Sequence, residues 1–255
     1  MKHRHVSKKH KLIFLLPPKT GSTSLSDCLH KLKIQFDSIM DTWNYSNYIH
    51  PTIMSKTEHN PFIDTTRHLL LSEILKAYDI KIEELDKYKI VQIIRNPYDR
   101  FVSAVYHQNI ILNKNYTVSE YLEKLNKSLY LLPNNQKLFY EKFYETPPDE
   151  DNNFLNHRWG GCMRHWFKQE WWNDIGANVN YFKLESITEN LEELSEFIDI
   201  KLSNFPHLRP GNSNRNNKYE KYFDETARIN FEKLYISDIE KFNYEFYNPL
   251  LKNLI

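Results

Sequence analysis

The sequence predicts an α/β protein whose central, mostly parallel sheet is flanked by helices. Short apolar runs that are typical of buried strands alternate along the chain with segments in which apolar residues recur at helical spacing. The chain has 255 residues, of which 40% are hydrophobic and 26% are charged, so it can bury a core. Because no change of composition marks a linker, we expect one domain over residues 1–255, with residues 1–10 as a basic, flexible leader.

A strand and a helix open the predicted fold, with a polar turn between them. Residues 11–16 hold an apolar run that ends at two prolines, which is typical of a buried strand. From Ser22 onward, apolar residues recur three and four positions apart, which predicts a helix with one buried face. Residues 41–66 are polar, aromatic and interrupted by prolines, so we expect a long loop or lid there, followed by a helix over residues 69–78.

The alternation of strands and helices continues through the rest of the chain. Residues 89–94 form a second apolar run, and the Asn96-Pro97 pair that follows fits the N-cap and first position of a helix. Thr117 and Glu120 have the spacing of a capping box at the start of another helix. The remaining predicted elements are a strand over residues 180–184 and helices over residues 189–198 and 224–242.

Charge, cysteine content and hydropathy exclude several classes of protein. The chain has 34 Lys and Arg against 33 Asp and Glu, so no nucleic-acid partner is expected. Its two cysteines, Cys28 and Cys162, exclude a disulfide scaffold and a four-cysteine zinc site. No apolar run approaches the ~20 residues that span a bilayer, and the first run is too short for a signal peptide. We therefore expect a cytoplasmic protein without stable membrane insertion.

The turn after the first strand has the composition of a phosphate-binding loop. Residues 17–24 read Pro-Pro-Lys-Thr-Gly-Ser-Thr-Ser and lead directly into the predicted helix, whose N-terminus offers N–H groups and a partial positive charge. Lys19 adds a cation and Gly21 permits a close approach of the backbone. A helix capped by a hydroxyl side chain is the alternative explanation. Unlike the loop of nucleoside triphosphatases, this one has its lysine before its glycine.

The second strand ends in a cation where a metal ligand is often found. In metal-dependent phosphoryl-transfer enzymes a later strand often ends in an aspartate that helps to hold the metal. Here it ends in Arg95, whose guanidinium can bind a phosphate directly through a fork of N–H donors. Ser103 follows eight residues later, two helical turns on, and could donate to the same anion. The sequence therefore predicts a site for two anionic groups and no metal.

Together, the two motifs resemble those of the sulfotransferases that use 3′-phosphoadenosine 5′-phosphosulfate (PAPS). Residues 18–25 are similar to the family's 5′-phosphosulfate loop, and residues 95–104 are similar to its 3′-phosphate segment. The resemblance is strongest to the carbohydrate branch, which includes the heparan sulfate 2-O enzymes and microbial relatives. Weaker likeness extends over residues 182–187, 206–213 and 238–244.

The resemblance implies a P-loop-like, three-layer fold and an activity. A sulfuryl group would pass from PAPS to a hydroxyl of a saccharide or glycan acceptor, leaving 3′-phosphoadenosine 5′-phosphate (PAP), without a metal. One alternative is O- or N-sulfation of a small-molecule metabolite. Others are a nucleotide kinase, which would need ATP and magnesium, and a nucleotide-binding module without catalysis.

The resemblance also implies roles for individual residues. Lys19 would neutralise charge on the leaving phosphate, while Arg95 and Ser103 would hold the 3′-phosphate. The expected cofactor-binding residues are Lys19, Thr20, Gly21, Ser22, Thr23, Ser24, Arg95, Ser103, Asn212 and Arg215. A catalytic histidine falls between the two motifs in the resembling enzymes, so we expect His68 to be the general base. His50, His59 and Glu73 remain alternatives for this role.

The acceptor-binding residues are the least determined by the sequence. We expect Arg67, His50 and Arg164 to contact the acceptor, although Arg67 could equally cap a helix. Arg164 belongs to an aromatic and basic segment, residues 159–172, which is either a platform for a sugar ring or part of the core. Cys162 and His165 in this segment form half a metal site at most.

Overall fold

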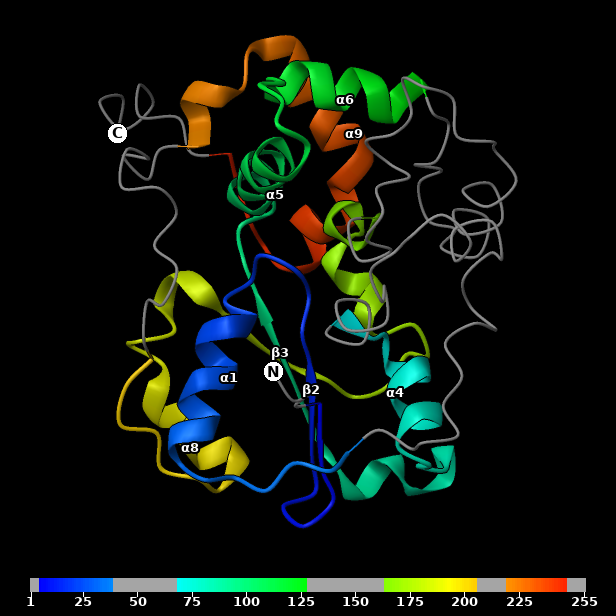
Figure 1. Ribbon diagram of the computed structural model, residues 1–255, viewed down its shortest axis with the longest axis vertical. Helices are drawn as coiled ribbons and strands as arrows, with labels where there is room; N and C mark the ends of the chain where they lie inside the picture. The colour runs from blue at the N-terminus through cyan, green and yellow to red at the C-terminus, as the bar shows by residue number, and fades with distance from the viewer. Residues whose placement is uncertain (1–4, 39–67, 128–162, 206–218, 247–255) are drawn as a thin grey trace. The chain divides into compact units, whose positions relative to one another are not determined.

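The computed structural model describes residues 5–38, 68–127, 163–205 and 219–246 (Figure 1). The chain divides into two compact units, residues 1–95 with 155–210 (unit 1) and residues 96–154 with 211–255 (unit 2). Each unit is built from two segments that are distant in the sequence, so no single linker in the sequence could mark the division. Among the described residues, none of the helices combines the length and apolarity that a bilayer-spanning segment needs.

Unit 1 contains a four-stranded sheet in the order β1-β2-β3-β4. Its strands are β1 (Val6–Ser7), β2 (Leu12–Leu15), β3 (Lys89–Ile94) and β4 (Asn180–Lys183). β2, β3 and β4 are parallel, with Ile13 opposite Ile90 and Ile93 opposite Phe182. The expected mostly parallel sheet is therefore confirmed, and its three long strands lie within one residue of the predicted positions.

β1 is the element that the sequence did not predict. It pairs antiparallel with β2, so that Val6 lies opposite Ile13. The preceding His5 is fully buried, and its Nδ1 donates to the Phe14 carbonyl over 2.9 Å. The expectation of a flexible leader is therefore wrong for residues 5–7, which are buried. A two-residue strand among lysines and histidines is too short to produce a recognisable period in the sequence.

Helices cover both faces of the sheet in unit 1. They are α1 (Ser22–Lys31), α4 (Leu71–Ala77) and α8 (Leu191–Ile198). Figure 1 shows α1 and α8 on one side of the strands and α4 on the other, which gives the expected three layers. The predicted helix boundaries are correct within two residues at each end. Short 3₁₀ turns in this unit are η3 (Ile82–Lys87), η5 (Met163–Trp166), η6 (Gln169–Trp172) and η7 (Leu184–Ser186).

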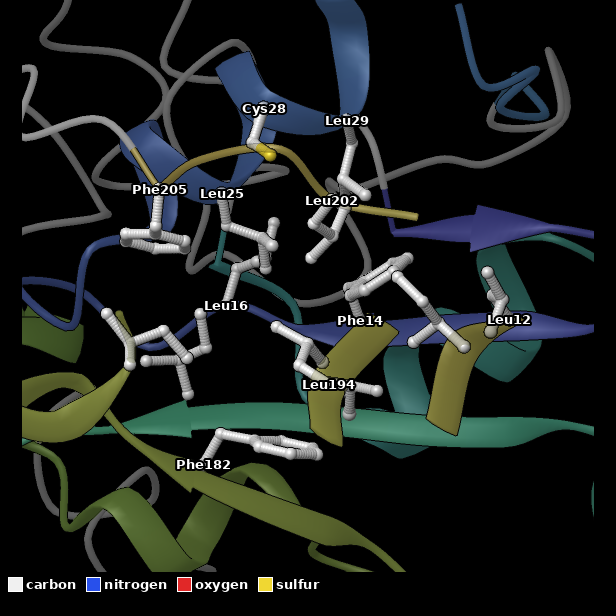
Figure 2. Packing of buried hydrophobic residues seen from close by; sticks show 14 residues of the cluster. Leu12, Phe14, Leu16, Leu25, Cys28, Leu29, Phe182, Leu194, Leu202 and Phe205 are labelled. Carbon is white, nitrogen blue, oxygen red and sulfur yellow. The ribbon is translucent and has the colours of Figure 1, made fainter. Parts of the chain in front are cut away.

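A hydrophobic core fixes α1 and α8 against the sheet (Figure 2). Leu12, Phe14 and Leu16 point into it together, because alternate residues of a strand share one face. Leu25 and Leu29 meet them from α1. Each such side chain contributes about 1.5–3 kcal/mol on burial. The core therefore fixes the helix whose N-terminus follows the phosphate-type loop.

Unit 2 is helical in its described part, and the three predicted helix starts in it are confirmed within one residue. It contains α5 (Pro97–Leu112), α6 (Val118–Lys127), α9 (Glu225–Lys241) and the 3₁₀ turn η8 (Tyr219–Tyr222). Asn96 caps α5, since its Oδ1 accepts hydrogen bonds from the Tyr98 and Asp99 amides. Thr117 and Glu120 bond reciprocally before α6, over 2.7 and 3.2 Å.

Candidate active site

The loop between β2 and α1 has a fixed and unusual backbone. Lys19 and Gly21 have φ angles of +67° and +80°, in the left-handed region. A Cβ atom added at Gly21 would lie 2.8 Å from a methyl carbon of Leu184, so the end of that side chain would have to shift, and the positive φ itself favours glycine. The Thr20 hydroxyl donates to the Pro17 carbonyl over 2.8 Å and ties the two sides of the loop together.

The N-terminus of α1 lies at the end of this loop. Gly21 is the N-cap residue, and its carbonyl accepts the Leu25 amide over 3.0 Å. No side chain caps this end, and the first turn contains no acidic residue. The alternative of a hydroxyl-capped helix is therefore wrong. A helix start of this kind presents N–H groups and partial positive charge, both of which favour an anion. The expected hydroxyl residues of the first turn are Ser22, Thr23 and Ser24.

Arg95 meets the loop directly. Its Nη1 donates to the Lys19 carbonyl over 3.0 Å, although the two residues are 76 positions apart. The contact follows from the sheet, because parallel β2 and β3 end at the same edge and each is followed by one of the two cationic residues. The structure therefore brings Arg95, the first residue of the second motif, against the loop of the first motif within unit 1.

Gln169, at the start of η6, holds the main chain of Arg95 and was not predicted from the sequence. Its Oε1 accepts the Arg95 amide and its Nε2 donates to the Arg95 carbonyl, each over 2.8 Å. The carbonyl of Gln169 in turn accepts from Nε2 of Gln92 over 2.7 Å. Both glutamines are fully buried. The one sequence signal was Gln92 itself, a polar residue inside an otherwise apolar strand.

His68 lies beside the same strand end. Its Nδ1 is 2.5 Å from the carbonyl oxygen of Leu16, the residue that follows β2. Because a carbonyl can only accept, Nδ1 carries the proton, and in the neutral ring Nε2 carries the lone pair. Leu16 is three residues before Lys19, so the expected base and the expected catalytic lysine are anchored on one short segment.

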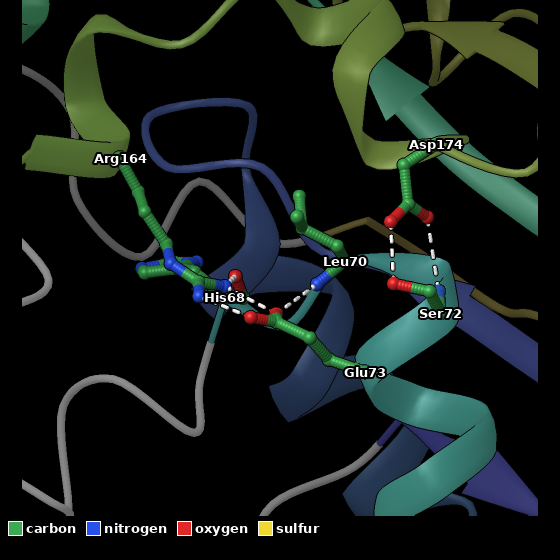
Figure 3. A network of polar contacts seen from close by, with 6 residues as sticks. All are labelled: His68, Leu70, Ser72, Glu73, Arg164 and Asp174. Carbon is green, nitrogen blue, oxygen red and sulfur yellow. Dashed lines mark hydrogen bonds and ion pairs between the residues drawn. The ribbon is translucent and has the colours of Figure 1, made fainter. Parts of the chain in front are cut away.

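A buried ion pair holds the backbone at His68 (Figure 3). Arg164 and Glu73 form two parallel hydrogen bonds of 2.7 Å, and both side chains are buried. The same Nη1 of Arg164 also donates to the His68 carbonyl. Glu73 accepts the Leu70 amide over 2.7 Å at the start of α4. We expected Arg164 to contact the acceptor, but these bonds to Glu73 and His68 give it a structural role.

The aromatic residues that follow Arg164 belong to the core. Trp166, Phe167, Trp171 and Trp172 are all buried. For these four residues, the alternative of a sugar-binding platform is wrong, since a platform needs exposed ring faces. His165 is buried too, and its ring packs edge-on against His68 with the ring centres 6.2 Å apart.

The remaining candidate residues lie elsewhere. Ser103 is buried on α5 in unit 2, and its role with Arg95 stays a prediction. The residues Arg67, His50, His59, Asn212, Arg215 and Cys162 lie outside the described ranges. Within those ranges, no three His, Cys, Asp or Glu side chains gather in a way that could hold a metal ion.

The fold and the loop define a class: a P-loop-like α/β protein in which a glycine-containing loop and a helix N-terminus follow β2 at the carboxyl ends of the parallel strands. The model of the sulfotransferase family matches residues 2–245. The chain therefore belongs to the sulfotransferase family and is an enzyme of sulfuryl transfer. No curated protein matches it with significant similarity.

Proposed function

We propose that the enzyme transfers a sulfuryl group from PAPS to a hydroxyl group of a saccharide or glycan. The observation that carries this proposal is the contact between Arg95 and the Lys19 loop, which joins two cationic residues and a helix N-terminus at one strand edge. PAPS carries one anionic group at its 5′ end and another at its 3′ position. The chemistry of these residues fits two anions, and a kinase-type aspartate is absent from the end of β3.

Each cationic residue has a distinct part in this proposal. When bound, PAPS supplies the sulfuryl group, and the bond between sulfur and the bridging phosphate oxygen breaks as the acceptor oxygen bonds to sulfur. Lys19 and the N–H groups at the start of α1 neutralise the charge that develops on the leaving phosphate, and such donors contribute about 3–4 kcal/mol each. Arg95 binds the 3′-phosphate through its guanidinium fork.

His68 accepts the proton of the acceptor hydroxyl at Nε2. The bond from Nδ1 to the Leu16 carbonyl supports this role, because it fixes the ring and places the lone pair on the other nitrogen. Glu73 is a weaker alternative, since both of its oxygens already accept hydrogen bonds from Arg164.

The saccharide acceptor rests on the resemblance of both motifs to the carbohydrate branch of the family. A small-molecule alcohol or amine is the second candidate acceptor. Arg67 and His50 stay proposed acceptor contacts, and Asn212 and Arg215 stay proposed cofactor contacts. A cytoplasmic place of action is likewise part of the proposal.

Titration with nucleotides tests the donor. We expect PAP without metal to raise the melting temperature, and ATP with magnesium to have a much smaller effect. Lys19→Ala should nearly abolish sulfuryl transfer while the protein stays folded, whereas Lys9→Ala, at an exposed lysine, should not. Stabilisation by ATP with magnesium alone would contradict the proposal. Transfer of labelled sulfate to desulfated glycans, compared with a panel of small alcohols and amines, distinguishes the two acceptor classes.

A further inference from the structure

We infer that Gln169 is a positioning residue that orients Arg95 for the 3′-phosphate and thereby makes the enzyme select 3′-phosphorylated nucleotides. This inference rests on the proposed function, since it assumes that Arg95 binds a nucleotide phosphate. Gln169 is buried, and its side chain bonds to the main chain of Arg95. It would therefore affect the nucleotide specificity of the site through Arg95.

Arg95 lies just beyond the last paired residues of the sheet. The pairing of β3 with β2 ends at Gln92, and its pairing with β4 ends at Ile94. The next residue, Arg95, lies beyond the end of both registers. In extended backbone, the N–H and the C=O of one residue point to the same side, so a single partner can bind both. The Gln169 side chain does this with two bonds of 2.8 Å.

Gln169 is itself held firmly. Its main-chain carbonyl accepts from Gln92 in β3 over 2.7 Å, so Gln169 is bonded both to the strand and to Arg95, three residues further along the chain. It begins η6, whose Trp171 and Trp172 are buried in unit 1. Because the Gln169 side chain is fixed in this way, it restrains the main chain of Arg95, the residue that follows β3.

The two bonds to Arg95 need a donor and an acceptor side by side, which the primary amide of glutamine supplies. Ionised glutamate has the same size as glutamine but would place a carboxylate oxygen against the Arg95 carbonyl, and methionine offers neither donor nor acceptor of comparable strength. Either change frees the main chain of Arg95 to rotate. The guanidinium, which now donates to the Lys19 carbonyl, would then lose its fixed direction toward an anion.

The test compares two nucleotides that differ by one group, PAP and adenosine 5′-monophosphate (AMP), in calorimetric titrations of the full chain. We expect Gln169→Met and Gln169→Glu to weaken PAP binding by about tenfold to a hundredfold, as for one or two lost buried hydrogen bonds. AMP binding should change by less than about twofold, because AMP has no 3′-phosphate. Gln35→Glu, at an exposed glutamine in unit 1, is the matched control and should change neither affinity.

The outcomes separate this inference from the proposed function. A wild type that binds PAP no better than AMP overturns both. If the wild type prefers PAP but the Gln169 variants keep the same ratio of PAP affinity to AMP affinity, because both affinities are unchanged or fall equally, only the positioning role is overturned. Gln169→Asn keeps the amide but withdraws it by one methylene, so it should give an intermediate ratio and serves where the other variants do not fold. In an Arg95→Ala background, changing Gln169 should have no further effect on the ratio.

Discussion

Arg164→Met removes one half of the buried ion pair that holds His68. The buried Glu73 carboxylate would then lose the two hydrogen bonds of 2.7 Å that it accepts from the Arg164 guanidinium. The His68 carbonyl would also lose the donor that Arg164 provides. Breaking a buried pair by removing one partner costs about 3–5 kcal/mol, and we expect a loss of unfolding free energy of that size.

The double variant is the more informative measurement. With Glu73→Met added, neither charge of the pair remains, and the Leu70 amide and the His68 carbonyl lose the partners described above, at about 1 kcal/mol each. We therefore expect the double variant to be more stable than Arg164→Met alone. Lys31→Met, which removes the exposed partner of Asp27 at 2.9 Å on α1 in the same unit, should cost about 1 kcal/mol or less.

Urea unfolding followed by tryptophan fluorescence measures these changes where they occur. Trp166, Trp171 and Trp172 all lie in unit 1, as do Arg164 and Glu73. A loss below about 1 kcal/mol in Arg164→Met would refute the view that this pair is a tight structural element. The same view would be refuted if the double variant lost as much unfolding free energy as Arg164→Met and Glu73→Met lose together. The effects of independent sites add, whereas those of two residues in direct contact do not.

Three further predictions concern single positions. His68→Ala should lower turnover by about 10²–10⁴-fold in a sulfate-transfer assay while PAP affinity stays unchanged, and His30→Ala, exposed on α1, is its control; loss of PAP binding with normal turnover would place the base elsewhere. Gly21→Ala should cost about 1–2 kcal/mol for its left-handed φ, because the Leu184 methyl that its Cβ would meet lies at the end of a flexible side chain and can shift. Gly176→Ala has a φ of the same sign and no atom within 4 Å, so a clearly larger loss at Gly21 in urea unfolding would show that Leu184 cannot move aside. Burial raises the pKa of the Cys28 thiol, so its peptide should resist iodoacetamide at neutral pH in mass spectrometry and react faster as pH rises; rapid labelling at neutral pH would show that the thiol is exposed.

The parts of the fold that could be predicted are those in which neighbouring residues determine the structure. β2 and β3 are short apolar runs ended by a proline pair and by Arg95, and the helix starts at Asn96 and Thr117 depend on side chains that bond within three residues. The loop around Gly21 was recognisable for the same reason, since its glycine and its cation lie side by side in the chain.

The missed contacts around the site depend on residues that are distant in the sequence. Gln169 reaches Arg95 across 74 positions, and Arg164 reaches Glu73 across 91. Spacing carries no information about such contacts, because they follow from how the sheet and its connections pack. Arg164 therefore appeared as a surface cation for a substrate, when its charge is neutralised inside the protein.

The short strand β1 has a consequence for how the protein can be handled. Val6 and Ser7 shield the outer edge of β2, and an open strand edge is a template for pairing with other molecules. Trimming the first ten residues as a dispensable basic tail would leave that edge bare. Shortened versions of the chain should therefore aggregate, and tags are better attached ahead of these residues than in place of them.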